Sequence, residues 1–111
     1  MIFVSRTILK VLTGSFAAAI SLWPFVFVRD KMHIDDPVLI NHEKIHLRQQ
    51  IELLLVIFYL WYGFEYLFYR IKGMDSKSAY RNICFEKEAY HFEKDLNYLK
   101  KRKWFGFMRK I

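Results

Sequence analysis

The segment IELLLVIFYLWYGFEYLFYR, residues 51–70, restricts the folds open to this chain more than any other. It is apolar on every helical face except at Glu52, Glu65 and Arg70, and a helix that is apolar all round must be covered by protein or by lipid. As a helix it would extend about 30 Å, close to the hydrocarbon thickness of a bilayer. We therefore expect one of two arrangements. The helix inserts into a membrane, and only shallowly because its two glutamates are costly in lipid. Alternatively, it is buried within the fold and in a homo-oligomer.

The helix that contains this segment is expected to begin upstream, at Pro37. Proline at the first helical position loses no hydrogen bond, and Asp35 or Asp36 can accept from the free amide groups of the first turn. No proline interrupts the chain from Pro37 to about Lys72. The pattern therefore predicts one long helix over this range.

The flanking segments predict a shorter strand and a second long helix. Leu22–Val28, which contains WPFVFV, is rich in the aromatic and β-branched residues typical of a strand. The wider apolar run Val11–Val28 follows a basic start, so a signal peptide or membrane anchor is the alternative interpretation. After a break at KGMDS, a final helix is predicted from about Lys77 to Lys101. The expected fold is α+β and mainly α.

Length and composition indicate one basic, aromatic-rich domain over residues 1–111. The chain is 54% hydrophobic and 19% aromatic, and 18 Lys and Arg against 11 Asp and Glu give a formal charge of +7. A basic excess favours anionic partners, either nucleic acid or the acidic face of a membrane. No nucleic-acid-binding motif accompanies the charge, so we expect no nucleic-acid partner.

The single cysteine and the basic end bear on where the protein is found. Cys84 cannot form an intrachain disulfide, which fits a reducing compartment. We expect a membrane-associated protein on the cytoplasmic side, with a soluble cytoplasmic protein as the alternative. The tail from Lys100 to Lys110 alternates basic and aromatic residues and is expected to be solvated, important for attachment to anionic lipid and not for the fold.

The segment NHEKIHLRQQ, residues 41–50, contains the strongest candidate site. On a helix, His42 and His46 project from one face and can present two imidazole nitrogens to one ion. Zinc accepts such nitrogens, and a catalytic zinc site adds a third ligand and leaves one position for water. Glu43 lies beside the pair and can take a proton from that water. The alternative is a solvated helix turn whose charges face water.

A third ligand is sought in FEKEAYHFEKD, residues 85–95. On a helical wheel Glu86 lies inside the apolar stripe and Glu93 follows in the same stripe, whereas Glu88 lies on a solvated edge and His91 points away. A glutamate on a buried face needs a partner, because an unpaired buried charge is costly. A metal ion held by the two histidines would be such a partner; an arginine or tyrosine of the core is the alternative.

Together these residues resemble the gluzincin zinc metallopeptidases, which have HExxH followed by a glutamate on a later helix. Residues 86–89, EKEA, look like the ExxA of the membrane-linked branch related to heat-shock protein X and the prenyl-protein proteases. The resemblance implies zinc held by His42, His46 and Glu86, with Glu43 as the general base in peptide-bond hydrolysis. That branch usually continues with aspartate, which supports a zinc-bound histidine, where this chain has Tyr90.

The small size also resembles the minigluzincins, in which a strand before the HExxH helix borders the cleft, and Leu22–Val28 is the expected equivalent. In peptide-bond hydrolysis, a His, Tyr or Arg near the zinc would stabilise the negatively charged oxygen of the transition state. The candidates are His33, Tyr80 and Tyr90, of which Tyr90 lies one turn from Glu86. The expected substrate is a peptide or protein. The alternative function is a catalytically silent, membrane-associated protein in which the same residues form a structural metal site or a polar network.

Overall fold

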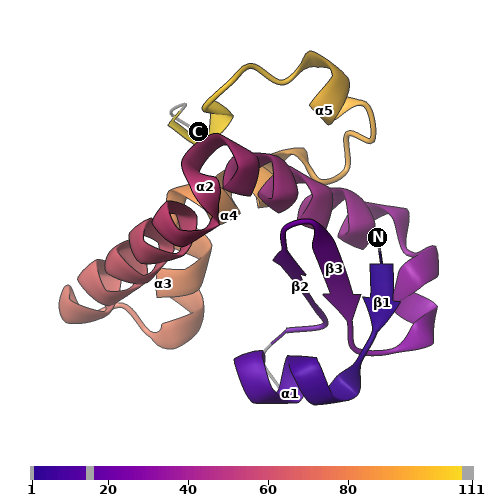
Figure 1. Ribbon diagram of the computed structural model, residues 1–111. Coiled ribbons are helices and arrows are strands. Elements are labelled where there is room, and N and C mark those ends of the chain that lie inside the picture. Colours follow the sequence, from indigo (N-terminus) through magenta and orange to yellow (C-terminus); the bar gives the residue numbers. More distant parts are fainter. Residues whose placement is uncertain (1, 15–16, 109–111) are drawn as a thin grey trace.

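The computed structural model describes residues 2–14 and 17–108 and shows an α+β fold that is mainly helical (Figure 1). A small sheet has the strand order β1-β3-β2, in which β1 runs parallel and β2 antiparallel to β3. The strands and α-helices are β1 (Ile2–Val4), α1 (Arg6–Thr13), β2 (Ala19–Leu22), β3 (Phe25–Val28), α2 (Pro37–Ile71), α3 (Ser76–Asn82), α4 (Cys84–Phe92) and α5 (Tyr98–Lys101). Short 3₁₀ helices cover Lys31–Asp35 and Gly106–Met108.

The prediction of one strand over Leu22–Val28 is wrong, because a turn divides this segment between β2 and β3. The turn contains Trp23 and Pro24, joined by a cis peptide bond. Proline has no amide hydrogen to donate to a strand ladder, so it is accommodated in the turn between the two antiparallel strands. The inner face of the resulting sheet packs on the first part of α2, through a cluster that contains Ala19, Val26, Val28 and Ile40.

The predicted start and end of the long helix are close to those of α2, but this helix is interrupted at Leu54. The Asp36 side chain caps its first turn by accepting from the amides of Val38 and Leu39. Leu54 has φ 58° and ψ 147°, which is not a helical conformation. The helix therefore changes direction (Figure 1), and we call residues 37–53 its proximal part and residues 55–71 its distal part.

The predicted continuous helix from Lys77 to Lys101 is wrong, because the chain forms α3, α4 and α5 instead. Ile83 is extended, with ψ 133°, and the amide of Cys84 donates to the Glu65 carboxylate on α2. After α4, the side-chain amide of Asn41 donates to the backbone carbonyls of Glu93 and Asp95. Side chains of α2 thus satisfy backbone groups that a continuous helix would have paired within itself.

The expectation that the basic tail is solvated and unimportant for the fold is wrong at Arg102 and Phe107. Phe107 is 2% exposed and belongs to a cluster with Phe58 and Phe85. The guanidinium of Arg102 is buried and pairs with the carboxylates of Glu88 and Glu52, at 2.5 Å and 2.7 Å. The tail therefore closes the core between α2 and α4.

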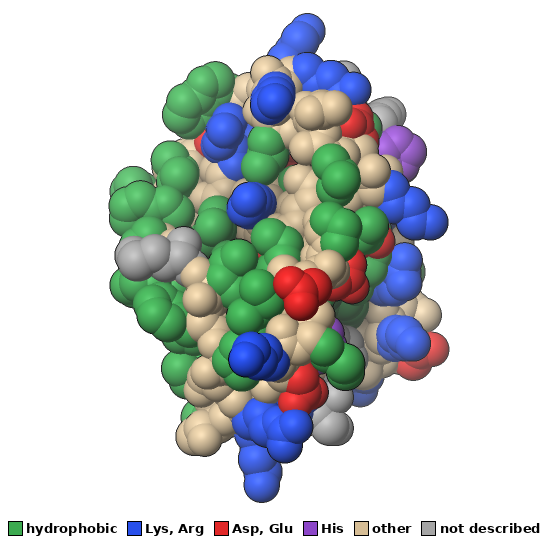
Figure 2. Space-filling view, turned by 90° about the vertical axis from the view of Figure 1, so that its right-hand side faces the viewer, with side chains coloured by type: hydrophobic (Ala, Val, Ile, Leu, Met, Phe, Trp, Pro, Cys, Tyr) green, Lys and Arg blue, Asp and Glu red, His purple; other side chains and the backbone are tan. Residues whose placement is uncertain are grey.

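Much apolar surface nevertheless stays exposed. Within the described residues, α2 is the one helix long and apolar enough to cross a membrane by length and composition, a test that core helices of soluble proteins also pass. Only 6% of its most apolar 18-residue stretch is buried. Figure 2 shows one face of the molecule on which hydrophobic side chains lie between Lys and Arg side chains.

Candidate metal centre

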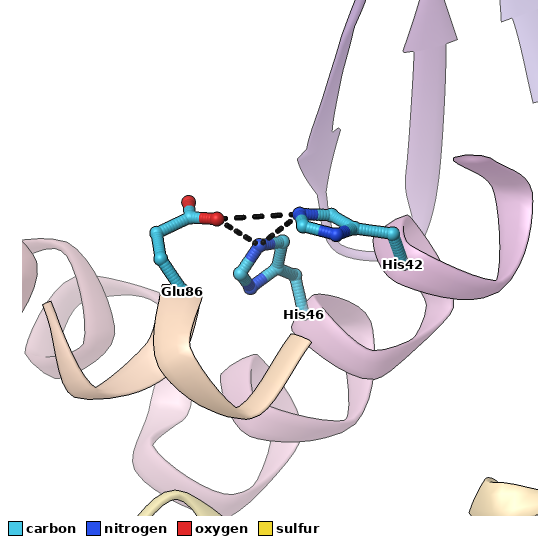
Figure 3. Close-up of side chains that lie close together, drawn as sticks. All are labelled: His42, His46 and Glu86. Atoms are coloured by element: carbon cyan, nitrogen blue, oxygen red, sulfur yellow. Dashed lines mark hydrogen bonds and ion pairs between the residues drawn. The ribbon is translucent and has the colours of Figure 1, made fainter. Parts of the chain in front are cut away.

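The structure brings the three predicted ligands together (Figure 3). The Nε2 atoms of His42 and His46 are 3.2 Å apart, and each lies 3.2 Å from Oε1 of Glu86. In tetrahedral zinc sites with bonds of about 2.0–2.1 Å, two ligand atoms are about 3.3–3.4 Å apart. The triangle of donor atoms therefore has the dimensions that one tetrahedral ion requires.

Two elements position these donors in a buried place. His42 and His46 lie one turn apart on the proximal part of α2, and Glu86 projects toward them from the first turn of α4. The three residues are 4%, 5% and 3% exposed, respectively. Burial strengthens the attraction between the carboxylate and any cation placed at this point, because little water screens it.

A carboxylate fixes the orientation of the first histidine. Nδ1 of His42 lies 2.8 Å from Oε2 of Glu93. An ionised carboxylate only accepts hydrogen bonds, so Nδ1 carries the hydrogen and, in the neutral ring, the lone pair is on Nε2. Glu93 thus orients the His42 ring with Nε2 toward His46 and Glu86.

An amide fixes the second histidine in the same way. Nδ1 of His46 lies 2.7 Å from Oε1 of Gln49. The Gln49 amide nitrogen donates to the carbonyl of Phe85 and to the carboxylate of Glu88, which leaves its oxygen to face the histidine. The Nε2 lone pair of neutral His46 therefore also points toward Glu86.

Three acceptors converge without a donor between them when both imidazoles are neutral, so the site requires a cation. In the metal-free chain a proton takes that place. Burial acts to lower the pKa of His46, but the Glu86 carboxylate outweighs it and raises this pKa to about 9. Burial acts to raise the pKa of Glu86, and the nearby histidines outweigh it and hold this pKa well below its usual range.

Glu43 lies beside the triangle without belonging to it. Its Oε2 is 3.9 Å from Nε2 of His42, and the residue is 5% exposed. Burial raises the pKa of this carboxyl group above its ordinary value, although His46 and His42 act in the opposite direction. A carboxylate next to the ligands is placed to accept a proton from water held there.

Glu43 and Tyr80 line two cavities that meet at the candidate site. The first cavity has a volume of about 380 Å³ and is lined mainly by apolar and tyrosine side chains, with His46 and Glu86 at its wall. The second, of about 490 Å³, is lined by His42, Glu93, Lys77 and Arg81 among others. The strand that borders the cavities is β2, mainly through Ala19–Ser21, so the assignment of the bordering strand to Leu22–Val28 is wrong.

The remaining candidate residues lie outside the triangle of donor atoms. Tyr90, the predicted transition-state stabiliser, packs its ring against His42 with centroids 4.6 Å apart, and its hydroxyl donates to that of Tyr80. His33 accepts from the Asp30 amide and takes part in capping a 3₁₀ helix. Glu88, expected on a solvated edge, is completely buried. The helical wheel misplaced it because the chain after α4 packs over this side of the helix, where Tyr98 and Arg102 donate to the Glu88 carboxylate.

Sequence reasoning missed Tyr62, whose hydroxyl donates to Oε2 of Glu86 at 2.6 Å. In a straight helix His46 and Tyr62 would be about 24 Å apart along the axis, too far for both side chains to reach one carboxylate. The interruption at Leu54 turns the distal part of α2 back toward the site. No local signal in the sequence marks this change of direction.

We expect Tyr62→Phe to weaken metal binding by about 10–100-fold, because it removes the hydrogen bond that holds the Glu86 carboxylate with Oε1 toward the histidines. Competition with a fluorescent zinc chelator measures this affinity. Tyr66→Phe is the matched control, since Tyr66 also lies on the distal part of α2 and lines the first cavity, but its hydroxyl pairs with Ser76. Equal affinities for wild type and Tyr62→Phe would contradict this role.

Comparisons of the chain with protein-family models, with curated proteins and with solved structures found no match. The resemblance to gluzincins therefore rests on the HExxH and ExxA residues themselves.

Proposed function

We propose that this protein is a zinc-dependent metallopeptidase of gluzincin type. The observation that carries the proposal is the convergence of His42, His46 and Glu86 on one buried point, with Glu43 beside it and open cavities next to it. Two imidazole nitrogens and one carboxylate are a typical ligand set of catalytic zinc. The expected substrate is a peptide or protein.

The roles of the side chains follow from their positions. A zinc ion held by His42, His46 and Glu86 would supply a Lewis acid for the scissile carbonyl and for a water molecule. The Glu43 carboxylate accepts a proton from that water and returns it to the leaving amine. Glu93 and Gln49 keep the Nε2 atoms of the two histidines directed at the site, and Tyr62 holds Glu86.

The alternative is a structural metal site in a catalytically silent protein, which the burial of all three ligands favours. Structural zinc sites usually have four protein ligands. Within the described ranges 2–14 and 17–108, the metal-binding group consists of three. A set of three protein ligands with Glu43 and a cavity beside it supports the catalytic function.

We predict one zinc per chain, lost in Glu86→Ala because the two histidines alone provide an incomplete ligand set. Elemental analysis of the purified proteins measures the stoichiometry. Lys87→Ala is the control, since it changes the exposed neighbour on the same helix.

Chelator-sensitive cleavage of a peptide library, restored by added zinc, is expected of the wild type. Full occupancy in Glu86→Ala, or cleavage unaffected by the chelator, would refute the proposal.

We further propose that the protein acts at a membrane. The exposure of the apolar residues of α2 and the net charge of +7 support this setting.

A further inference from the structure

The distal part of α2 presents a continuous row of exposed apolar side chains, which we call the apolar stripe. At about 100° per residue its members fall within about 120° of the helix circumference, so they lie on one side of the helix. They are 48–76% exposed: Val56, Ile57, Leu60, Phe64, Leu67, Phe68 and Ile71. A contiguous apolar surface of this kind on a helix marks an interaction site.

Another side of the same helix is packed against protein. Phe58, Trp61 and Tyr62 belong to the cluster formed with Ile83 and Phe85 of the α3–α4 segment. Lipid therefore cannot surround the distal part of α2, and the break at Leu54 shortens the straight segment. A helix with one apolar side free and the other packed is suited to lie in the plane of a membrane surface, and not to cross the bilayer.

Positive charges border the stripe. Arg70 and Lys72 are exposed at its C-terminal end, and the Lys72 ammonium lies 5.1 Å from the centre of the Phe68 ring. Exposed Lys10 lies on α1, which together with the distal part of α2 borders the first cavity. Cations beside an apolar surface complement the negative charge of anionic headgroups. A second copy of the chain would place the same positive charges opposite these and would supply no negative charge to pair with them.

The cavity of the metal centre lies next to this stripe. Leu12 of α1 and Gly63 of α2 both line it, and both residues are exposed. Leu12 is 53% exposed and Phe64, adjacent to Gly63, is 71% exposed. Figure 1 shows α1 and the distal end of α2 both projecting on the lower side of the molecule. The rim of the cavity is thus built from exposed apolar residues, while Glu43, His46 and Glu86 lie at its wall.

We infer that the apolar stripe and the C-terminal end of α1, at Leu12, dock in the headgroup boundary of an anionic bilayer. The cavity of the metal centre then opens toward the membrane. Resting on the proposed function, this assigns as substrate a peptide segment held at the membrane surface, with an apolar side chain that enters the first cavity. The docking itself requires no hydrolysis and can be measured without it.

Vesicle flotation tests the surface, with phosphatidylcholine vesicles that contain or lack phosphatidylserine. The triple variant Leu60→Gln, Phe64→Gln, Leu67→Gln should bind phosphatidylserine vesicles at least about tenfold more weakly than wild type, because three side chains that enter the interface become polar. The matched control is Met32→Gln, Ile34→Gln, Leu96→Gln, which removes three exposed apolar residues outside both the stripe and the basic tail. Circular dichroism and zinc content establish that the variants are folded.

The possible failures are distinguishable. A wild type that floats with neither vesicle refutes membrane association, and equal binding by both triple variants refutes the assignment of the surface. If light scattering shows that wild type is an oligomer in the absence of vesicles and that the stripe variant is a monomer, a second copy covers the stripe and the inference is overturned.

Quenching by brominated lipid tests the direction in which the cavity opens. Leu12→Trp should be quenched more strongly than Met32→Trp when each variant binds phosphatidylserine vesicles that contain brominated phosphatidylcholine, because Leu12 lies at the rim of the cavity. Wild type gives the contribution of the three native tryptophans. Equal quenching in the two variants would show that the cavity does not face the bilayer.

Discussion

Glu43→Gln is expected to lower peptide hydrolysis by about 10²–10⁴-fold while the protein keeps its fold and its zinc. The substitution is nearly isosteric and removes the group that accepts the proton from water. Glu43 is not one of the three converging ligands, so metal binding should persist. In a structural metal site the same substitution would leave every measured property unchanged.

The measurement compares wild type, Glu43→Gln and Lys44→Gln for cleavage of a peptide library, with zinc content determined on the same samples. Lys44 is the adjacent exposed residue and should behave as wild type. Chelator-sensitive cleavage that survives Glu43→Gln at full rate would rule out the general-base role. Loss of zinc from this variant would show that Glu43 is a ligand.

Arg102→Met is expected to destabilise the fold by about 3–5 kcal/mol, because it leaves buried carboxylates without their cation. The guanidinium donates to Glu88 through Nε and Nη2 and to Glu52 through Nη1 and Nη2, and the Tyr98 hydroxyl also donates to Glu88. Glu88 in turn accepts from Gln49, the residue that orients His46. The variant should therefore bind zinc more weakly as well.

Urea unfolding of the zinc-free proteins separates the stability of the fold from metal binding. Lys101→Met is the control. The Lys101 side chain is 66% exposed and its ammonium pairs with Asp95 at the surface. Such surface pairs contribute about 0–1 kcal/mol to the free energy of unfolding. Equal unfolding midpoints for the two variants would mean that Arg102 does not hold the tail in the core. An unchanged zinc affinity would show that Glu88 does not influence the orientation of His46.

Features that depend only on neighbouring residues could be predicted from the sequence. Asp36 and Pro37 specify the start of α2, because capping involves only the first turn of a helix. Two histidines four positions apart face the same side of any helix, so HExxH predicted a ligand pair. Glu86 was also found from its apolar neighbours, since its place in the first turn of α4 depends on a short stretch of helix.

The distant residues that complete the site could not be predicted, because they depend on how the helices pack. The interruption at Leu54 brings Tyr62 to Glu86, and the end of the chain packs over Glu88 so that Arg102 supplies its cation. Each of these positions depends on a partner at least 14 residues away in the chain. Periodicity describes one helix at a time, and it contains no information about where two helices turn and meet.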